Sequence, residues 1–193
     1  MTTYILDAEW EVEEGDDVVL GAKRLHCIVL KEFRSDKLIQ FLPDTHQTWK
    51  TLTGTLVLPV NAYPMSRFSE WLRLQDNITV VAHNLLSADL EVFRRLLGIP
   101  FTVGPDTIMS KKCTFIDTFT LSKRLNPDRP MAYYKGKSVG QHGLKAWGVR
   151  LGILKPEVED WVNQPIEVYL HRCEEDVKIN EATYEMLLEE MEK

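Results

Sequence analysis

Two acidic residues near the start of the chain, Asp7 and Glu9, are the first whose type and spacing could do chemistry. They lie in the apolar segment Tyr4–Trp10 (YILDAEW), and a short apolar run is typical of a strand buried in a sheet. Strand side chains alternate between faces, so both carboxylates would point the same way, roughly 7 Å apart. A divalent cation would offset their repulsion, because hard cations prefer carboxylate oxygens. Alternatively, the strand lies at a sheet edge and both acids are in water.

Two further acids stand where predicted helices begin. Asp89 follows a predicted strand, Ile78–Ala82, and opens a predicted helix, while Asp176 falls in the first turn of a predicted last helix, Glu174–Glu192. Either acid could simply cap its helix and complement the helix dipole. Four separated acids around one sheet also suit a site for two metal ions, one activating the attacking water and the other stabilising the leaving oxygen of a phosphodiester.

Composition sets the broad class of protein. The chain has 193 residues, 44% hydrophobic and 27% charged, which predicts one globular domain over residues 1–193. No apolar stretch approaches about 20 residues and no signal pattern opens the chain, which indicates a cytoplasmic protein without membrane contact. The scattered Cys27, Cys113 and Cys173 form no CxxC pair, which argues against a disulfide framework or a zinc site. A net charge of −6 disfavours phosphate binding, unless bound metal ions return positive charge locally.

The order of elements predicts an α/β fold. A meander of three strands opens the chain, and shorter strands then alternate with helices, which indicates a mixed β-sheet flanked by helices. Two stretches, Pro43–Pro64 and Asn126–Gly140, have loop-like composition. The predicted strands are Tyr4–Trp10, Leu25–Phe33, Lys37–Leu42, Ile78–Ala82 and Thr114–Ile116, and the helices between and after them are Ala88–Leu97, Leu121–Leu125, a helix through Leu144, Trp147 and Leu151, and Glu174–Glu192.

Three segments carry a resemblance to a known family. LDAEW, AHNLLSADLEVF and HRCEED resemble, in order, the three motifs of the DEDD superfamily of 3′–5′ exonucleases, which share the ribonuclease H-like fold. FIDTFTLSKRL and GQHGLKAWGVRLGILK resemble the exonuclease domain of family-A phage replicative DNA polymerases, although no polymerase domain follows. The resemblance implies one ion held by Asp7, Glu9 and Asp176, and a second held by Asp7 with help from Asp89. The ions would be Mg²⁺, with Mn²⁺ substituting.

The last motif departs from the polymerase pattern. Polymerase-type domains place a tyrosine four residues before the last aspartate, where this chain has Arg172. His171 instead lies five residues before Asp176, the spacing of the DEDDh subgroup, which resembles bacterial proofreading subunits and oligoribonucleases. The resemblance therefore implies that His171 is the general base, a role for which histidine suits neutral pH. The alternative is that His171 only packs ahead of the helix.

Several side chains near the acids could hold the substrate. Trp10 and Leu85 could wedge against terminal bases, although Trp10 could equally be a core residue. We expect Ala8, His83 and Asn84 to line or brace the site. Aromatic and basic residues of the Asn126–Gly140 loop could stack on bases and follow the backbone of a single strand, or be an ordinary solvated face; the residues expected to bind are Tyr133, Tyr134, Lys135 and Lys137.

The sequence thus predicts a monomeric, stand-alone, magnesium-dependent 3′–5′ exonuclease. Its substrate would be the 3′ end of single-stranded DNA, its products nucleoside 5′-monophosphates, and a replication protein a possible partner. Two alternatives remain open. One is an exoribonuclease of the same fold, because the sugar edge is recognised by backbone and shape contacts that sequence does not reveal. The other is an inactive nucleic-acid-binding or scaffold module, although a scaffold has no use for a full set of mutually repelling acids.

Overall fold

A computed structural model describes residues 2–45, 61–99 and 113–193 and places them around a mixed sheet of six strands. The strands lie in the order β4-β3-β2-β1-β5-β6, so β1 (Thr2–Glu11) is central, contrary to the alternative of an edge strand. β2 (Arg24–Glu32) and β3 (Leu38–Leu42) form the predicted antiparallel meander with it, whereas β5 (Ile78–Ala82) and β6 (Cys113–Asp117) continue the sheet in parallel. The predicted mixed sheet flanked by helices is confirmed.

Alternation along β1 divides the core into two layers. Tyr4, Leu6 and Ala8 face one side of the sheet and join the larger apolar cluster, while Ile5 faces the other side. Asp7 and Glu9 lie two and four residues after Ile5, so their side chains point to the same face of the sheet. Both layers therefore bury the strand, and the two acids lie on a covered face of the sheet.

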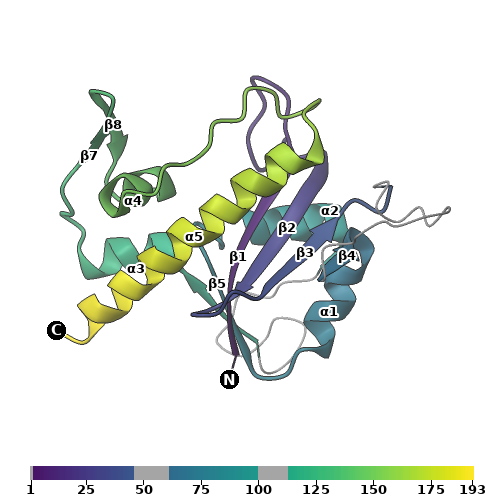
Figure 1. Ribbon diagram of the computed structural model, residues 1–193, viewed down its shortest axis with the longest axis horizontal. Coiled ribbons are helices and arrows are strands. Elements are labelled where there is room, and N and C mark those ends of the chain that lie inside the picture. The colour runs from purple at the N-terminus through teal and green to yellow at the C-terminus, as the bar shows by residue number, and fades with distance from the viewer. Residues whose placement is uncertain (1, 46–60, 100–112) are drawn as a thin grey trace.

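Helices cover the two faces unequally (Figure 1). The short helices α1 (Phe68–Leu74) and α2 (Asp89–Leu97) lie on one face, where they pack Phe68, Leu72, Val92 and Phe93 into the larger cluster. The long helix α5 (Ile166–Met191) crosses the other face and packs against β1 and β2. Helices α3 (Thr118–Leu125) and α4 (Leu144–Leu151) pack against α5.

The last helix begins eight residues earlier than the sequence indicated, at Ile166 instead of Glu174. Pro165 stands at its N-cap position and Tyr169, Cys173 and Val177 recur on its buried face, a spacing of four residues that packs one side of a helix. Asp176 therefore lies in the interior of α5. The reading of Asp176 as a dipole-complementing residue of the first turn is wrong.

Both predicted loops contain strands. Residues 46–60 of the loop Pro43–Pro64 lie outside the described residues, and its end forms the short strand β4 (Ala62–Pro64), preceding a 3₁₀ turn over Met65–Arg67. The loop Asn126–Gly140 contains a hairpin of β7 (Ala132–Tyr134) and β8 (Lys137–Gly140). Its two-residue turn has φ of 48° at Lys135 and 74° at Gly136, and such a turn matches the twist of paired strands. Within the described residues no helix has the length and apolarity needed to cross a membrane.

Candidate metal centre

Three carboxylates meet between the central strand and the long helix. Asp7 and Glu9 project from β1 towards α5, and Asp176 projects from the buried face of α5. One oxygen from each lies within 4.8 Å of the oxygens of the other two. Asp176 and Glu9 are buried. Among the described residues this is the one group of three close acidic, histidine or cysteine ligands.

The fourth predicted acid, Asp89, lines the same cavity from the other layer. It is the first residue of α2, which follows β5 after a short loop, and its side chain is buried. The cavity measures about 340 Å³ and brings together all four acids of the sequence-predicted set. Its full lining is Asp7, Ala8, Glu9, Trp10, Val12, Val18, His83, Asn84, Ala88, Asp89, Lys155, Trp161, Arg172 and Asp176.

A larger cavity, about 780 Å³, lies elsewhere and is lined in part by Arg24, His26 and Tyr169. His26 there stacks on Tyr169, with ring centroids 3.8 Å apart, and its Nε2 lies 2.7 Å from the carbonyl of Trp161. These contacts hold the His26 ring between β2 and the turn before α5. Size alone does not mark a site, and we place the candidate chemistry in the smaller, acid-lined cavity.

Burial and mutual repulsion raise the pKa values of three of the acids, Asp7, Glu9 and Asp89. Burial, followed by the charges of Asp176 and Glu9, raises the pKa of Asp7 well above its ordinary value. Burial and Asp176 raise the pKa of Glu9 to about 8, and burial raises that of Asp89 to about 7. Each shift has the direction expected when carboxylates lose water and face one another. A bound cation would reverse it.

Two cations that the sequence analysis did not assign to the site neutralise part of this charge. Lys155 Nζ lies 2.5 Å from Asp176 Oδ2. Arg172 Nε lies 3.1 Å from the same oxygen and 3.4 Å from Glu9 Oε1. The spacing of Arg172, four residues before Asp176 on one helix, could have identified it. Lys155 carries no such signal, because it comes from the irregular segment between α4 and α5.

The structure does not place His171 beside the acids, so the expected position of this residue is wrong. His171 is exposed on α5 and does not line the cavity. Because α5 is continuous here, a step of five residues turns about 500°, which leaves His171 about 140° away from the direction of Asp176. A step of four residues turns about 400°, which brings Arg172 to the correct side. A helix beginning at Glu174, as predicted, would not include His171, so its direction could not be read from the sequence.

The other predicted substrate-binding residues near the acids divide into two groups. Ala8, Trp10, His83 and Asn84 line the cavity. Leu85 does not, because it is fully buried in the larger apolar cluster. It cannot wedge against a base, and the prediction for Leu85 is wrong. The next residue, Leu86, is 45% exposed.

Asp117, another residue that the sequence analysis did not assign, holds the loop that carries His83 and Asn84. Its carboxylate accepts hydrogen bonds from the backbone amides of Asn84 (3.2 Å) and Leu86 (3.0 Å), and also caps α3 through the amide of Thr120 (3.1 Å). One side chain thereby ties the end of β6 to the loop before Asp89. The sequence signal was an aspartate at a strand-to-helix junction.

His83 lies at the cavity wall as a neutral imidazole. Its Nδ1 lies 2.9 Å from the hydroxyl of Thr118, which donates to Asn180 Oδ1 at 2.7 Å. Burial, with a contribution from the charge of Lys155, lowers the pKa of His83 to about 3. This histidine therefore connects the end of β5 to α3 and α5 at the cavity wall.

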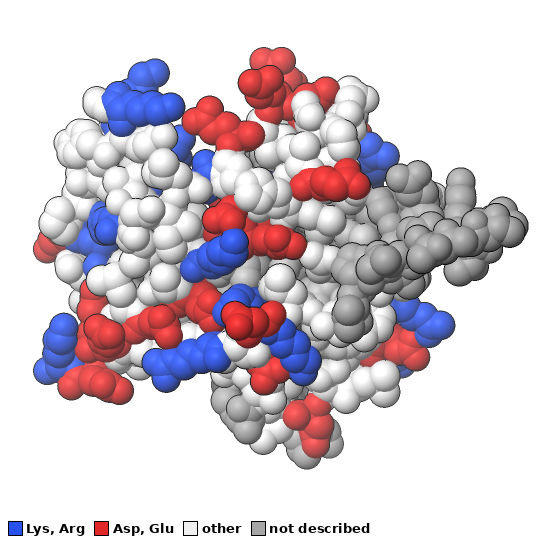
Figure 2. Space-filling model, viewed as in Figure 1, with Lys and Arg blue, Asp and Glu red and all other residues white. Residues whose placement is uncertain are grey.

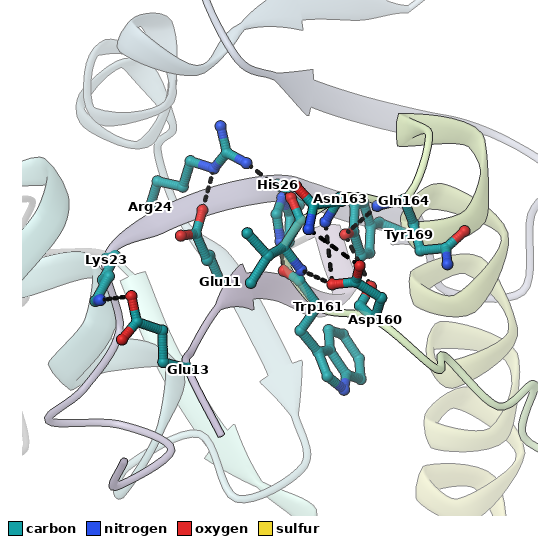
Figure 3. A network of polar contacts seen from close by, with 11 residues as sticks. Glu11, Glu13, Lys23, Arg24, His26, Asp160, Trp161, Asn163, Gln164 and Tyr169 are labelled. Atoms are coloured by element: carbon teal, nitrogen blue, oxygen red, sulfur yellow. Dashed lines mark hydrogen bonds and ion pairs between the residues drawn. The ribbon is translucent and has the colours of Figure 1, made fainter. Parts of the chain in front are cut away.

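An aromatic residue, Trp161, enters the cavity from the turn before α5. Figure 3 shows how that turn is fixed: Asp160 accepts hydrogen bonds from the amides of Val162 and Asn163, and the hydroxyl of Tyr169 joins the carbonyl of Asp160 to the amide of Gln164. Arg24 of β2 also donates to the carbonyl of Val162 at 3.0 Å. Trp161 thus lines the same cavity as Trp10 and is held there without a regular element around it.

The remaining predicted substrate residues lie on the hairpin, outside the acidic cavity. Tyr133 is 63% exposed, and Lys135 and Lys137 are exposed. Tyr134 faces a small pocket against α4, where Lys135 Nζ and Lys145 Nζ lie 5.1 and 5.7 Å from the centre of its ring. Basic side chains mark the hairpin at the upper left of the molecule, while acidic and basic groups alternate along the face that α5 presents (Figure 2).

The donor set fits a divalent cation. Asp7 Oδ2 and Asp176 Oδ1 are buried and have no hydrogen-bond partner within the described part of the chain. Buried carboxylate oxygens without partners are costly, and metal coordination is one way to satisfy them. All the close ligands are oxygens, which suits Mg²⁺ or Mn²⁺ better than a metal that prefers sulfur or nitrogen.

Comparison with solved structures confirms the predicted ribonuclease H-like fold. An exonuclease I structure covers 94% of this chain with a TM-score of 0.54 at 14% identity. The Aedes aegypti Nibbler EXO domain covers 97% with a TM-score of 0.51, also at 14% identity, and E. coli exonuclease I in complex with a dT13 oligonucleotide covers 96% with a TM-score of 0.51 at 12% identity. At these identities the likeness establishes the fold.

The matched proteins differ in length from this chain. It spans 39% of the first exonuclease I chain, 40% of the E. coli chain and 85% of the Nibbler EXO domain. No protein-family model matches the sequence, and no curated protein is similar to it at the sequence level.

Proposed function

We propose that this protein is a divalent-metal-dependent 3′–5′ exonuclease that releases nucleoside 5′-monophosphates from single-stranded DNA. The observation that carries the proposal is the meeting of Asp7, Glu9 and Asp176 within 4.8 Å, where two buried carboxylate oxygens have no partner in the described ranges 2–45, 61–99 and 113–193. The shared fold with exonuclease I and the Nibbler EXO domain agrees with it. The complex of E. coli exonuclease I with dT13 favours single-stranded DNA as the substrate to test first.

The acids and the two tryptophans of the cavity have separate roles in the proposed reaction. Asp7, Glu9 and Asp176 would hold one Mg²⁺, and Asp7 with Asp89 a second. When bound, such ions lower the pKa of coordinated water and offset the negative charge of a phosphodiester. Trp10 and Trp161 offer apolar surface on which a terminal base can stack.

The cations and the histidine complete the site. Lys155 and Arg172 bring positive charge against a phosphate, and Arg172, which has donors and no acceptor, cannot take a proton from water. His83, held neutral, keeps the loop of Asn84 in place through Thr118. In the described conformation no side chain is assigned as general base, because His171 lies outside the cavity.

One observation favours a second candidate function, a nucleic-acid-binding module without catalysis. Lys155 and Arg172 already pair with Asp176 and Glu9, so part of the acidic charge is neutralised without any metal. If these pairs are permanent, metal ions do not enter and the protein only binds.

A single assay separates these functions. Single-stranded DNA and RNA of one sequence, each labelled at the 5′ end, are incubated with the protein in Mg²⁺ and in EDTA. We expect a ladder that shortens from the 3′ end, faster on DNA, absent in EDTA and absent in Asp7→Asn. The exposed, remote acid variant Asp36→Asn is the matched control and should cleave as wild type does. Binding without shortening in Mg²⁺ or Mn²⁺ would identify the binding module, and a faster RNA ladder the exoribonuclease.

A further inference from the structure

Lys155 forms part of two neighbouring cavities. It lines the acidic cavity, where its ammonium lies 2.5 Å from Asp176 Oδ2, and it also lines the small pocket beneath Tyr134 and Lys145. Its side chain is only 19% exposed. No other residue is shared by these two cavities in the described part of the chain. We propose that Lys155 is an exchangeable counter-ion: it occupies Asp176 in the metal-free protein, and metal binding releases it to hold a backbone phosphate of the nucleic acid beside Tyr134. The inference rests on the proposed function.

The backbone at Lys155 is fixed, whereas its side chain can move. The amide of Ile153 donates to the carbonyl of Gly148 at 2.9 Å, and Arg172 donates through Nη1 to the carbonyl of Pro156. Gly148 permits this close approach, since a Cβ there would lie 2.5 Å from the carbonyl oxygen of Ile153. Two hydrogen bonds therefore hold the segment on either side of Lys155. Lysine itself is a point charge on a flexible four-carbon stem, suited to changing partners.

The acids give a reason for the exchange. Asp176 Oδ2 is shared by Lys155 and Arg172, while Oδ1 has no partner among the residues that the structure describes. An ammonium carries one charge and a divalent cation two, so the metal is the stronger counter-ion for three close carboxylates. A divalent cation held by Asp176 would repel the ammonium of Lys155, and this repulsion would favour movement of the flexible lysine side chain. Arg172 is held more firmly, by its additional bond to Pro156.

The surface beside Tyr134 is positively charged and would attract an anion. The pocket beneath it measures only about 10 Å³, so a phosphate would lie on this surface and not inside the pocket. Lys145 and Lys135 both lie near the ring of Tyr134, and neither forms a salt bridge with an acid among the described residues. A third ammonium arriving there would be repelled unless an anion joined it. A backbone phosphate next to the scissile one is such an anion, and the aromatic ring of Tyr134 offers a surface for its base. Metal loading would thereby prepare this surface to hold the strand.

The test compares Lys155→Met with Lys145→Met, which removes a neighbouring charge that does not touch the acids. Calorimetric titration with Mn²⁺, without nucleic acid, measures metal affinity. Fluorescence anisotropy of a labelled oligothymidylate in Ca²⁺ measures strand affinity. We expect Lys155→Met to bind Mn²⁺ about tenfold more tightly, equivalent to about 1.4 kcal/mol, and to bind the oligothymidylate more weakly, with a salt dependence lower by about 0.7. Lys145→Met should lose strand affinity and keep wild-type Mn²⁺ affinity.

Opposite changes in the two affinities are the signature of the exchange, which a purely structural lysine would not produce. Unchanged or weaker Mn²⁺ binding by Lys155→Met overturns the counter-ion role, and unchanged oligothymidylate binding overturns the phosphate role. If Lys155→Met does not fold, Lys155→Gln replaces it, because glutamine keeps a hydrogen-bond donor for Asp176. The expected directions of change in Mn²⁺ and oligothymidylate affinity are the same. If wild-type protein binds no Mn²⁺, the proposed function itself is refuted. If wild-type protein binds Mn²⁺ and cleaves, but the variants do not show the opposite changes in affinity, only the exchange is refuted.

Discussion

Glu9→Gln should stabilise the metal-free protein at alkaline pH while impairing its response to metal. The carboxyl of Glu9 is buried, and its pKa is raised from 4.5 to about 8 by burial first and by Asp176 second. Its folded pKa lies above its unfolded pKa, so the folded state holds the proton more tightly. Stability is therefore fully present below pH 4.5 and is lost as the pH rises towards 8.

The pKa difference sets the size of the effect. At about 1.4 kcal/mol for each pH unit, the shift corresponds to an upper limit of about 5 kcal/mol. Arg172, whose Nε lies 3.4 Å from Glu9 Oε1, loses a charged partner in the variant, which offsets part of the gain. We expect a net stabilisation of about 2–3 kcal/mol at pH 8, or roughly 4–12 °C in Tm for a chain of this size.

Thermal unfolding in EDTA at pH 5 and pH 8 measures the effect, with Asp36→Asn as the exposed control. Glu9→Gln should melt above wild type at pH 8 and close to it at pH 5, and the control should follow wild type at both. Mg²⁺ at about 100 times its Kd should add about 2.7 kcal/mol to wild type and much less to Glu9→Gln. The reasoning is refuted if the variant melts at or below wild type at pH 8, or if Mg²⁺ stabilises both proteins equally.

Three further substitutions test the placement of residues around the site. His171→Ala should change the hydrolysis rate less than threefold, because His171 is exposed on α5. A loss of about 10²–10⁴, the usual contribution of a general base, would instead show that α5 unwinds and brings His171 into the acidic cavity. Asp117→Ala should lower the free energy of unfolding by about 2–4 kcal/mol, since it removes a helix cap and two further hydrogen bonds to backbone amides. Urea unfolding measures this loss. Stability equal to wild type would contradict the role of Asp117 in holding the loop of His83 and Asn84. Gly148→Ala should lower both Tm and the hydrolysis rate by displacing Ile153 and Lys155, and a variant with unchanged Tm would show that the segment yields without cost.

The sequence alone determined the acids and the elements that carry them. Alternation along Tyr4–Trp10 put Asp7 and Glu9 on one face, and apolar runs located β5 and β6 with useful accuracy. These are local properties, because the side-chain period of a strand and the ends of an apolar run are written in consecutive residues. The position of Asp89 at a helix start followed in the same way.

Only the tertiary structure decided which residues join those acids. The start of α5 depends on packing of Tyr169, Cys173 and Val177 against β1 and β2, and a short stretch of sequence does not reveal such long-range contacts. Because the helix begins early, His171 faces solvent and Arg172 faces the acids. Lys155 reaches Asp176 from an irregular segment, through contacts between residues far apart in the chain. Local propensity fixes where an acid lies along its own element, whereas long-range packing fixes which charges meet it.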